Sequence, residues 1–282
     1  MERSVQPLLA VRSPDLRVIE TARLLLHEEP DPVRVDRLTR SLQRDGVLRN
    51  PAMVAQAPEQ HAVVLDGANR ITALRTLGIP HAVVQVVPYG SPEVSLSTWR
   101  HYIRDDGRPS LSEAVAALDG VRVIPATDAR EAEGRLARRD AVAAIIDGRV
   151  AALIGRLGDI VADANTLNRI VALYRGTGRI YRVDSGDAEA LSGAYGPGTL
   201  VIFPPFGKDE ILLIAARGGR LPTGITRHII PGRALRLNVP LSVLAGPEGA
   251  AAKQRHLDAT LQERWLEHGV RYYAEPTYLF DE

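Results

Sequence analysis

The sequence contains no cysteine among its 282 residues. This absence excludes disulfide bonds, thiolate metal ligands and thiol nucleophiles. The sequence also lacks any apolar run close to the roughly 20 residues that a membrane-spanning helix needs. Its first residues lack the apolar core of a signal peptide. We therefore expect a cytoplasmic protein without a membrane partner.

Excess charge is also absent, because 35 basic residues face 34 acidic ones and the net charge is +1. Because the basic and acidic residues are so nearly equal in number, the chain has no broad attraction to nucleic acid, and we expect no nucleic-acid partner. Lysine is scarce: Lys208 and Lys253 are the two lysines, and the other basic residues are arginines. Genome composition or heat adaptation explains this bias, unless particular arginines bind phosphate or carboxylate.

The first part of the sequence predicts a compact α/β unit. Residues 1–16 have the pattern of a loosely structured lead-in. Asp31 is a good N-cap, Pro32 suits a first helical turn, and Gly46 ends the helical spacing that follows. A second helix is expected at residues 68–77. Short apolar runs predict strands at 23–26, 52–55, 61–65 and 82–87.

The pattern changes after residues 91–107, which we interpret as a connecting segment. Asp147-Gly148, between two apolar runs, is a strong hairpin signal. The length favours two domains, which we place at residues 1–95 and 96–282. We expect a larger C-terminal α+β domain with helices at 111–118, 128–138, 160–173, 209–216 and 251–268, and strands at 179–183, 200–203, 227–230, 234–238 and 270–278.

The stretch LDGANRITALRTLGI, residues 65–79, joins a strand to a helix through Asp66 and Gly67. A glycine before a helix N-terminus exposes backbone N–H groups at the positive end of the helix dipole, which favours an anion. Asn69 and Arg70 add side-chain donors for phosphate oxygens. A plain capping turn explains the same pattern, and Gly207-Lys208-Asp209 lacks the leading glycine and hydroxyl of a Walker motif.

Several motifs together resemble the ParB/sulfiredoxin-like fold: Leu26-His27-Glu28, Gly46-Val47-Leu48-x-Asn50-Pro51 and Asp66-Gly67-x-x-Arg70. Sulfiredoxin-type reductases place a reactive cysteine in the phosphate loop, where this chain has Ala68. Chromosome-partition proteins usually carry Gly-x-Arg-Arg and a helix-turn-helix domain. Here Asn69 precedes Arg70, and no helix-turn-helix pattern is evident.

The free L-serine kinase branch of that superfamily is similar over nearly the whole chain. The similarity adds Ser97-Thr98-Trp99-Arg100-His101, Pro222-x-Gly224-x-Thr226-Arg227, Gly232-Arg233 and Leu237-x-Val239-Pro240-Leu241. Residues 110–200 align poorly, and no role is carried over to them. The resemblance implies an N-terminal ParB/sulfiredoxin-like domain, a larger C-terminal α+β domain and an active site in the cleft between them.

The resemblance also implies catalytic roles. Gly67, Ala68, Asn69 and Arg70 would hold the phosphates of ADP or ATP. Glu28 matches the glutamate that acts as base on the substrate hydroxyl, and Asp66 matches an aspartate that acts through Mg²⁺ or water. By themselves, Glu28 fits a solvated or salt-bridged charge and Asp66 a helix cap. Glu29 is the nearest rival to Glu28, but successive residues of an extended segment face opposite ways.

The amino-acid pocket would come from downstream residues. The similarity assigns Thr223, Thr226, Arg227 and His228 to L-serine, with Arg227 on the carboxylate, and makes Trp99 and His101 walls of the pocket. As bare features, Thr-Arg-His on a strand is more often a surface face, and Trp99 equally suits packing between domains.

Two alternatives stay open. A partition-type nucleotide-binding DNA clamp or regulator would share the phosphate loop, although the low net charge weighs against it. A kinase for threonine or homoserine is also credible, because one methylene changes binding by only about 1–3 kcal/mol. The sequence does not choose between ADP and ATP, and it leaves a homodimer open.

Overall fold

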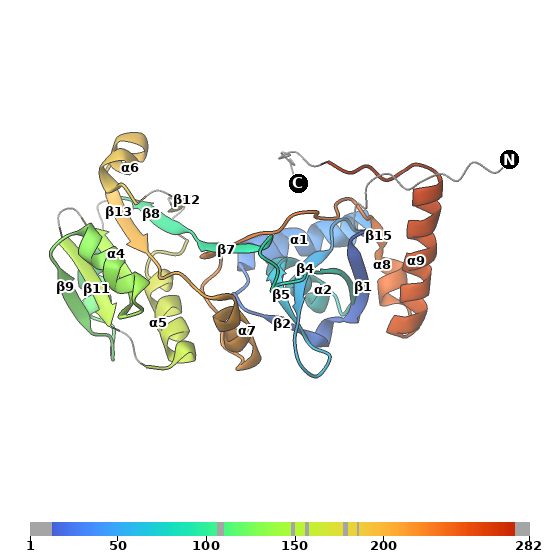
Figure 1. Ribbon diagram of the computed structural model, residues 1–282, viewed down its shortest axis with the longest axis horizontal. Coiled ribbons are helices and arrows are strands. Elements are labelled where there is room, and N and C mark those ends of the chain that lie inside the picture. Colours follow the sequence, from blue (N-terminus) through green and yellow to red (C-terminus); the bar gives the residue numbers. More distant parts are fainter. Residues whose placement is uncertain are drawn as a thin grey trace.

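We describe a computed structural model of the chain at residues 13–105, 110–147, 150–155, 158–176, 180–184 and 186–273. The fold is mixed α/β: a five-stranded mixed sheet and a six-stranded antiparallel sheet lie in different parts of the molecule, and two short strand pairs accompany them (Figure 1). None of the helices in the described residues is long and apolar enough to cross a membrane.

The five-stranded sheet has the order β1-β6-β4-β5-β2. β1 pairs antiparallel with β6 and β4 pairs antiparallel with β5, whereas β4–β6 and β2–β5 are parallel. The strands are β1 Asp15–Glu20, β2 Leu24–Leu26, β4 Ala52–Gln56, β5 Ala62–Asp66 and β6 His81–Val86. The parallel pair matters for function, because β2 and β5 end at the same edge of the sheet.

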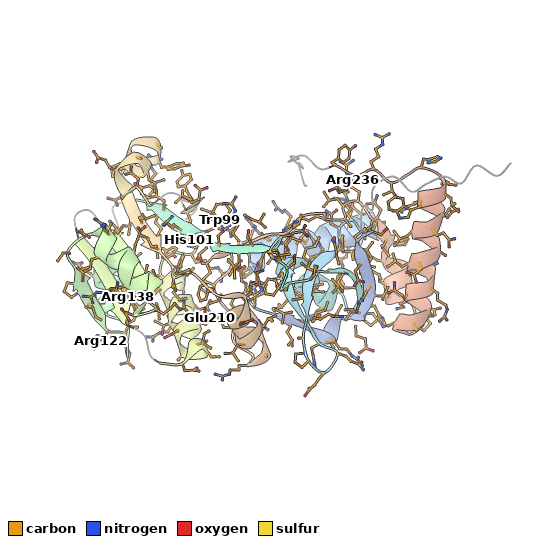
Figure 2. The ribbon with its side chains drawn as sticks, viewed as in Figure 1. Trp99, His101, Arg122, Arg138, Glu210 and Arg236 are labelled. Carbon is orange, nitrogen blue, oxygen red and sulfur yellow. The ribbon has the colours of Figure 1, made fainter. Side chains whose placement is uncertain are left out.

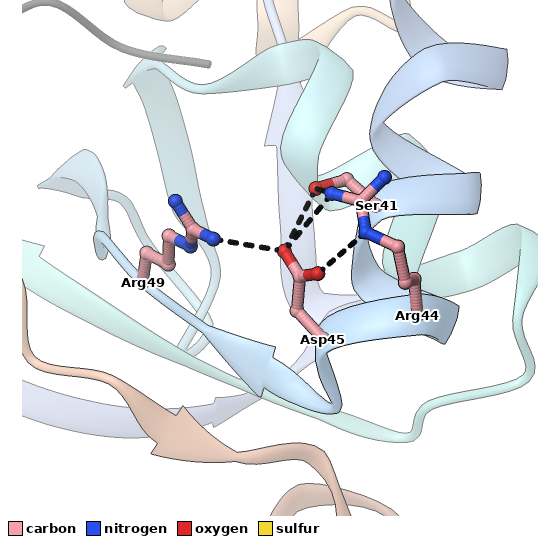
Figure 3. Close-up of polar contacts among 4 residues, drawn as sticks. All are labelled: Ser41, Arg44, Asp45 and Arg49. Atoms are coloured by element: carbon pink, nitrogen blue, oxygen red, sulfur yellow. Dashed lines mark hydrogen bonds and ion pairs between the residues drawn. The ribbon is translucent and has the colours of Figure 1, made fainter.

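Two helices pack on this sheet, α1 Pro32–Asp45 and α2 Ala68–Thr76. The predicted start and end of α1 are confirmed: the Asp31 side chain accepts from two first-turn amides, and Gly46 adopts the left-handed conformation. At the end of α1, Asp45 accepts from Ser41, Arg44 and Arg49 (Figure 3). These bonds, led by that from Arg44, hold the pKa of Asp45 below its usual value.

The last helices return to the first sheet. β15 (Val239–Pro240) pairs with β3 (Val47–Leu48), and α8 (Leu241–Ala245) and α9 (Ala250–Leu266) follow. Gln254 of α9 accepts from the backbone N–H of Val18 at 2.7 Å and donates to the carbonyl of Leu16 at 3.1 Å. Helix α9 thus covers the edge strand β1, which would otherwise expose unpaired backbone groups.

The six-stranded sheet has the order β12-β8-β13-β10-β11-β9, and all of its pairs are antiparallel. Its strands are β8 Arg100–Arg104, β9 Val123–Ala126, β10 Ala141–Asp147, β11 Val150–Gly155, β12 Ile180–Val183 and β13 Gly198–Ile202. β10 and β11 form the hairpin that the sequence predicts, although its turn at residues 148–149 lies outside the described residues.

The helices that accompany this sheet are α3 Leu111–Ala116, α4 Ala129–Ala137, α5 Ile160–Ala172, α6 Ala188–Tyr195 and α7 Lys208–Ala216. Helix α7 lies between the two sheets (Figure 1). One buried cluster includes Val63 and Leu65 of β5, Ile211 and Ile214 of α7, and Ile145 of β10. The two sheets therefore share a hydrophobic core through α7. The division at residue 95 stays a prediction.

Three sequence predictions for residues 1–107 differ from the structure. Residues 91–107 are more than a connecting segment, because they contain the strands β7 (Ser95–Thr98) and β8. Strand β8 lies inside the six-stranded sheet. The lead-in predicted at 1–16 also runs too far, since β1 begins at Asp15, whereas residues 1–12 lie outside the described part. A short 3₁₀ turn, η1 (Thr21–Arg23), replaces the expected start of the strand at 23–26.

The strand predicted at 234–238 is also wrong. Arg236 and Asn238 have φ of 56° and 49°, which interrupts an extended conformation. Side chains bind this backbone instead: Gln85 accepts from the Ala234 N–H and Asn50 from the Arg236 N–H, both at 2.8 Å. Residues 270–273 are not a strand, and the rest of the strand predicted at 270–278 lies outside the described residues.

Candidate active site

The carboxyl ends of β2 and β5 bring Glu28 and Asp66 to the same edge of the sheet. Leu26 pairs with Val64 in the parallel register, and Glu28 and Asp66 each follow two residues later. His27, which precedes Glu28 in the sequence, is buried, and its Nδ1 lies 2.6 Å from the carbonyl oxygen of Val64. Neighbouring strands lie about 4.8 Å apart, so the base predicted at Glu28 and the phosphate loop after Asp66 are neighbours.

The carboxylate of Glu28 is held by the turn that begins β14 (Thr226–Ile229). Its Oε2 accepts from the Gly224 N–H at 3.0 Å, and its Oε1 accepts from the Thr226 N–H at 2.8 Å and from the Thr226 hydroxyl. The backbone of Glu28 also forms a parallel bridge with Leu221. These contacts fix the carboxylate to residues almost 200 positions later in the chain.

A line of polar side chains continues from this carboxylate. The Nε2 atom of His27 lies 2.9 Å from the Thr226 hydroxyl, and the His27 ring meets that of His228 edge-on at 5.3 Å. His228 is buried, and its Nε2 lies 2.8 Å from the hydroxyl of Tyr89. Burial, helped by His27, lowers the pKa of His228 to about 3, so this imidazole is neutral at pH 7.

Gly67 makes the turn from β5 into α2 with φ of 107°, a conformation that favours glycine. A Cβ at this position would lie 3.0 Å from the Cβ of Ala52 and 2.9 Å from the Nη1 of Arg70. No side chain caps the first turn of α2, and the first amides of a helix lack partners within it. The turn therefore presents backbone donors closely packed against β4.

The polar side chains of the loop make contacts of their own. Asn69 accepts from the Asp31 N–H at 2.7 Å, which ties α2 to the start of α1. Arg70 donates to the carbonyl of Pro51 at 2.9 Å. The two side chains thus support the shape of the loop in this structure.

Asp66 pairs with Arg233 at 2.5 Å, and Arg233 also donates to the carbonyl of His228 at 3.4 Å. Arg233 therefore links the end of β5 to β14. Within the described residues, no group of three or more His, Asp or Glu side chains is arranged to hold a metal ion. Mg²⁺ commonly takes one or two carboxylates together with substrate phosphates, and Asp66 suits that smaller requirement.

Trp99 and His101 lie along the segment that leads from β7 into β8 (Figure 2). The guanidinium of Arg227 lies 4.3 Å from the centre of the Trp99 ring, and Arg227 also approaches Asp184 at 3.7 Å. His101 is buried, and its Nδ1 lies 2.9 Å from the hydroxyl of Tyr174. Burial, followed by the charge of Arg182, lowers the pKa of His101 to about 4.

The structure therefore brings together most, but not all, of the residues that the sequence singled out. Glu28, Asp66, Gly67, Thr226 and His228 form one contiguous group. Half-buried Thr223 lies on the same turn, whereas the side chain of His101 is buried. Two cavities, of about 790 and 620 Å³, lie elsewhere, along β1 and at the start of β2. Hydrogen bonds and strand register define this site.

Sequence reasoning missed Tyr89, Arg34 and Arg182. Tyr89 follows β6 and reaches His228. Arg34 and Arg182 come from α1 and β12, and their charges act on one another. Nothing in the local sequence distinguishes these two from the other arginines, because sheet pairing over long sequence distances places them here.

Comparison with solved structures shows the fold of free serine kinases. SbnI with a C-terminal truncation, from Staphylococcus aureus, matches with a TM-score of 0.71, 24% identity and coverage of 89% of this chain and 97% of that one. A free serine kinase solved with ADP, as a glutamate-to-alanine variant, matches with a TM-score of 0.70 and 21% identity, over 83% and 95%.

Curated relatives agree with the structural match, whereas no protein-family model matches the chain. The ATP-dependent L-serine kinase SbnI of Staphylococcus aureus is 25% identical over 277 residues, 95% of this chain and 97% of the relative. The ADP-dependent L-serine kinase SerK of Thermococcus kodakarensis is 24% identical over 239 residues, 82% and 93% of the two chains. This chain is therefore similar to free L-serine kinases along almost its entire length.

Proposed function

We propose that this protein is a free L-serine kinase, which transfers a phosphoryl group from ADP or ATP to the hydroxyl of L-serine and releases O-phospho-L-serine. One observation carries the proposal: the Glu28 carboxylate and the Gly67 turn lie at the same sheet edge, and three donors orient the carboxylate. Near-full-length similarity to ATP- and ADP-dependent L-serine kinases supports it.

Phosphoryl transfer asks the protein mainly to position its reactants and to neutralise charge. In this proposal, Glu28 accepts the proton of the serine hydroxyl. The hydroxyl oxygen then forms its bond to the terminal phosphorus, while the bond from that phosphorus to the bridging oxygen breaks and the shortened nucleotide leaves. Thr226 keeps one carboxylate oxygen occupied and so aims the carboxylate at the acceptor.

The Gly67 turn would hold the phosphates with backbone N–H groups of Ala68, Asn69 and Arg70 at the helix N-terminus. Asp66 would orient Mg²⁺, which when bound shields the negative charge of the phosphates. Arg233, paired with Asp66, would hold that carboxylate in place. We keep ADP and ATP as equal candidates for the donor.

The amino-acid pocket in this proposal is formed by residues after position 95, including Thr223, Thr226 and His228, with Trp99 as a wall. The phosphate-binding part comes from residues 1–95, and the site opens between the two parts. Neutral His228 and its partner Tyr89 would line the pocket without adding a charge.

A direct assay tests the proposal. Purified protein is incubated with L-serine, Mg²⁺ and either ADP or ATP, and O-phospho-L-serine is measured by mass spectrometry. We expect product with at least one donor, and none without nucleotide or without L-serine. L-threonine and L-homoserine in parallel reactions measure acceptor strictness. Absence of phosphoserine with both donors, in a folded sample at several temperatures, would refute the kinase assignment.

A further inference from the structure

Arg182 reaches the proposed site from β12. This strand pairs with β8 so that Arg182 lies opposite His101. The guanidinium of Arg182 lies directly against the Cα of Gly224: a Cβ at position 224 would overlap its Nη2, Cζ and Nε atoms. Gly224 is also the residue whose N–H binds Glu28. The backbone of Gly224 therefore lies between the guanidinium of Arg182 and the carboxylate of Glu28, the proposed base.

Charges of both signs act on Arg182. Burial lowers the pKa of Arg182, and the neighbouring charge of Arg34 lowers it further, while Glu28 and Asp31 act in the opposite direction. Among the described residues, neither Arg182 nor Arg34 forms an ion pair within 4.0 Å. The guanidinium of Arg182 thus has no carboxylate bonded to it within the described part of the chain, and an anion bound beside it would be stabilised by its charge.

Arg227, the arginine that the sequence suggested for the carboxylate, faces another way. Thr226 and His228 both contact His27, so their side chains lie on one side of β14. Successive strand residues point to opposite sides, and Arg227 accordingly stacks on Trp99 and approaches Asp184. Its guanidinium is already engaged, whereas that of Arg182 lies beside the turn that holds Glu28.

We propose that Arg182 binds the carboxylate of the amino-acid acceptor and selects acceptors that carry one. This inference rests on the proposed kinase function and names the residue that recognises the substrate. Two carbon atoms separate the hydroxyl and the carboxylate of serine, so a cation for the carboxylate must lie close to the base. The planar guanidinium of arginine suits a carboxylate, which it can bind through two parallel hydrogen bonds.

The nucleotide phosphates are the other anions that could attract Arg182. They are the weaker candidate because the Gly67 turn, on the β5 side of Glu28, already offers backbone donors to phosphate. Arg182 approaches Glu28 from the Gly224 side. The hydroxyl of serine would then lie between the phosphate and the carboxylate site, as in-line transfer requires.

The test compares L-serine with L-serinamide, which keeps the hydroxyl but lacks the carboxylate. Steady-state kcat/KM is measured for both acceptors with wild type, Arg182→Gln, Arg227→Gln and the matched control Arg138→Gln. Arg138 is an exposed arginine of the same part of the chain, and it lies away from Trp99 in Figure 2. Nucleotide affinity is measured by calorimetry for every variant.

For Arg182→Gln we expect kcat/KM for L-serine to fall about 10- to 100-fold, while that for L-serinamide and the affinity for nucleotide change less than about twofold. Arg138→Gln should match wild type, and Arg227→Gln should keep most of the preference for L-serine. Arg182→Lys, which keeps the charge but loses the two-pronged geometry, should lie between Arg182→Gln and wild type, and it replaces Arg182→Gln if that variant does not fold.

Equal losses for both acceptors in Arg182→Gln, or an unchanged preference for L-serine, would overturn this inference and leave the kinase assignment standing. Binding of L-serine, measured by calorimetry with nucleotide present, separates the two proposals. If wild type forms no phosphoserine but binds L-serine more tightly than Arg182→Gln does, the kinase assignment fails and the carboxylate site stands. If wild type binds no L-serine, both fail.

Discussion

Thr226 binds Glu28 twice, through its backbone N–H at 2.8 Å and through its hydroxyl, and both bonds end on the same oxygen, Oε1. A carboxylate with one oxygen held in this way cannot rotate freely, and its Oε2 bonds to the N–H of Gly224. The remaining lone pairs have fixed directions. This arrangement suits a group that must meet a hydroxyl at a defined angle.

Glu28→Gln should lower phosphoserine formation by at least about 100-fold, because an amide cannot accept the hydroxyl proton. Nucleotide affinity should change by less than about threefold. Glu29→Gln is the matched control, since Glu29 pairs with Arg220 at 3.3 Å on the half-exposed surface and should retain near wild-type activity. Single-turnover assays and calorimetry check both variants. Loss of nucleotide binding in Glu28→Gln would contradict the assigned role.

Thr226→Val removes a hydroxyl that bonds to Glu28 and lies 2.9 Å from the Nε2 of His27. We expect the free energy of unfolding to fall by about 1–2 kcal/mol, because buried His27 and half-buried Glu28 each lose a partner. Turnover should fall as well, since the carboxylate is less well oriented. Thr223→Val, on the same turn, should leave stability nearly unchanged while raising KM for L-serine. Urea denaturation and steady-state kinetics distinguish the two effects.

Gly67→Ala introduces a Cβ within 3.0 Å of the Cβ of Ala52 at a φ of 107°. Strain and crowding together should destabilise the protein by about 1–3 kcal/mol and weaken nucleotide binding. Gly78→Ala separates the two causes, because Gly78 has a φ of 67° but nothing within 4 Å of the added Cβ. That control should lose only about 1 kcal/mol and keep its nucleotide affinity. Equal nucleotide affinity in both variants would refute the close approach of phosphate to Gly67.

The buried imidazoles predict acid sensitivity. The pKa is lowered from 6.5 to about 4 for His101 and to about 3 for His228, mainly by burial. Below pH 6.5 the unfolded chain gains protons that the folded chain does not, so stability is complete above pH 6.5 and declines as the pH falls towards these values. Each histidine should cost about 2 kcal/mol at pH 5.

Urea denaturation between pH 7.5 and pH 5 measures this decline. His101→Asn removes one of the two titrating groups, so its midpoint should depend less steeply on pH than that of wild type, even if its stability at pH 7.5 is lower. Identical slopes for the two proteins would show that the buried imidazole of His101 does not cause the acid sensitivity.

Local signals in the sequence predicted the elements whose ends are marked by caps. Asp31 and Gly46 bound α1 as expected, and Asp147 ends the first strand of the predicted hairpin. These features depend on residues close together in the chain, which is why one sequence could indicate them.

Contacts between distant segments could not be predicted in this way. The strand predicted at residues 234–238 does not form, because the side chains of Gln85 and Asn50 bind the backbone of this segment. Arg182 was overlooked because its place beside Gly224 depends on the pairing of β12 with β8. The hydrogen bond from the Asp31 N–H to the Asn69 side chain could not be predicted either, because the two residues lie far apart in the sequence.

The docking of α9 on β1 has a consequence for synthesis on the ribosome. Leu16 and Val18 emerge early, but Gln254, which satisfies their backbone groups, is translated some 236 residues later. During that interval the nascent chain has an uncovered edge strand, which can pair with other chains. Slowing translation should therefore increase aggregation of unfinished chains, and binding of a chaperone to the first sheet should prevent it.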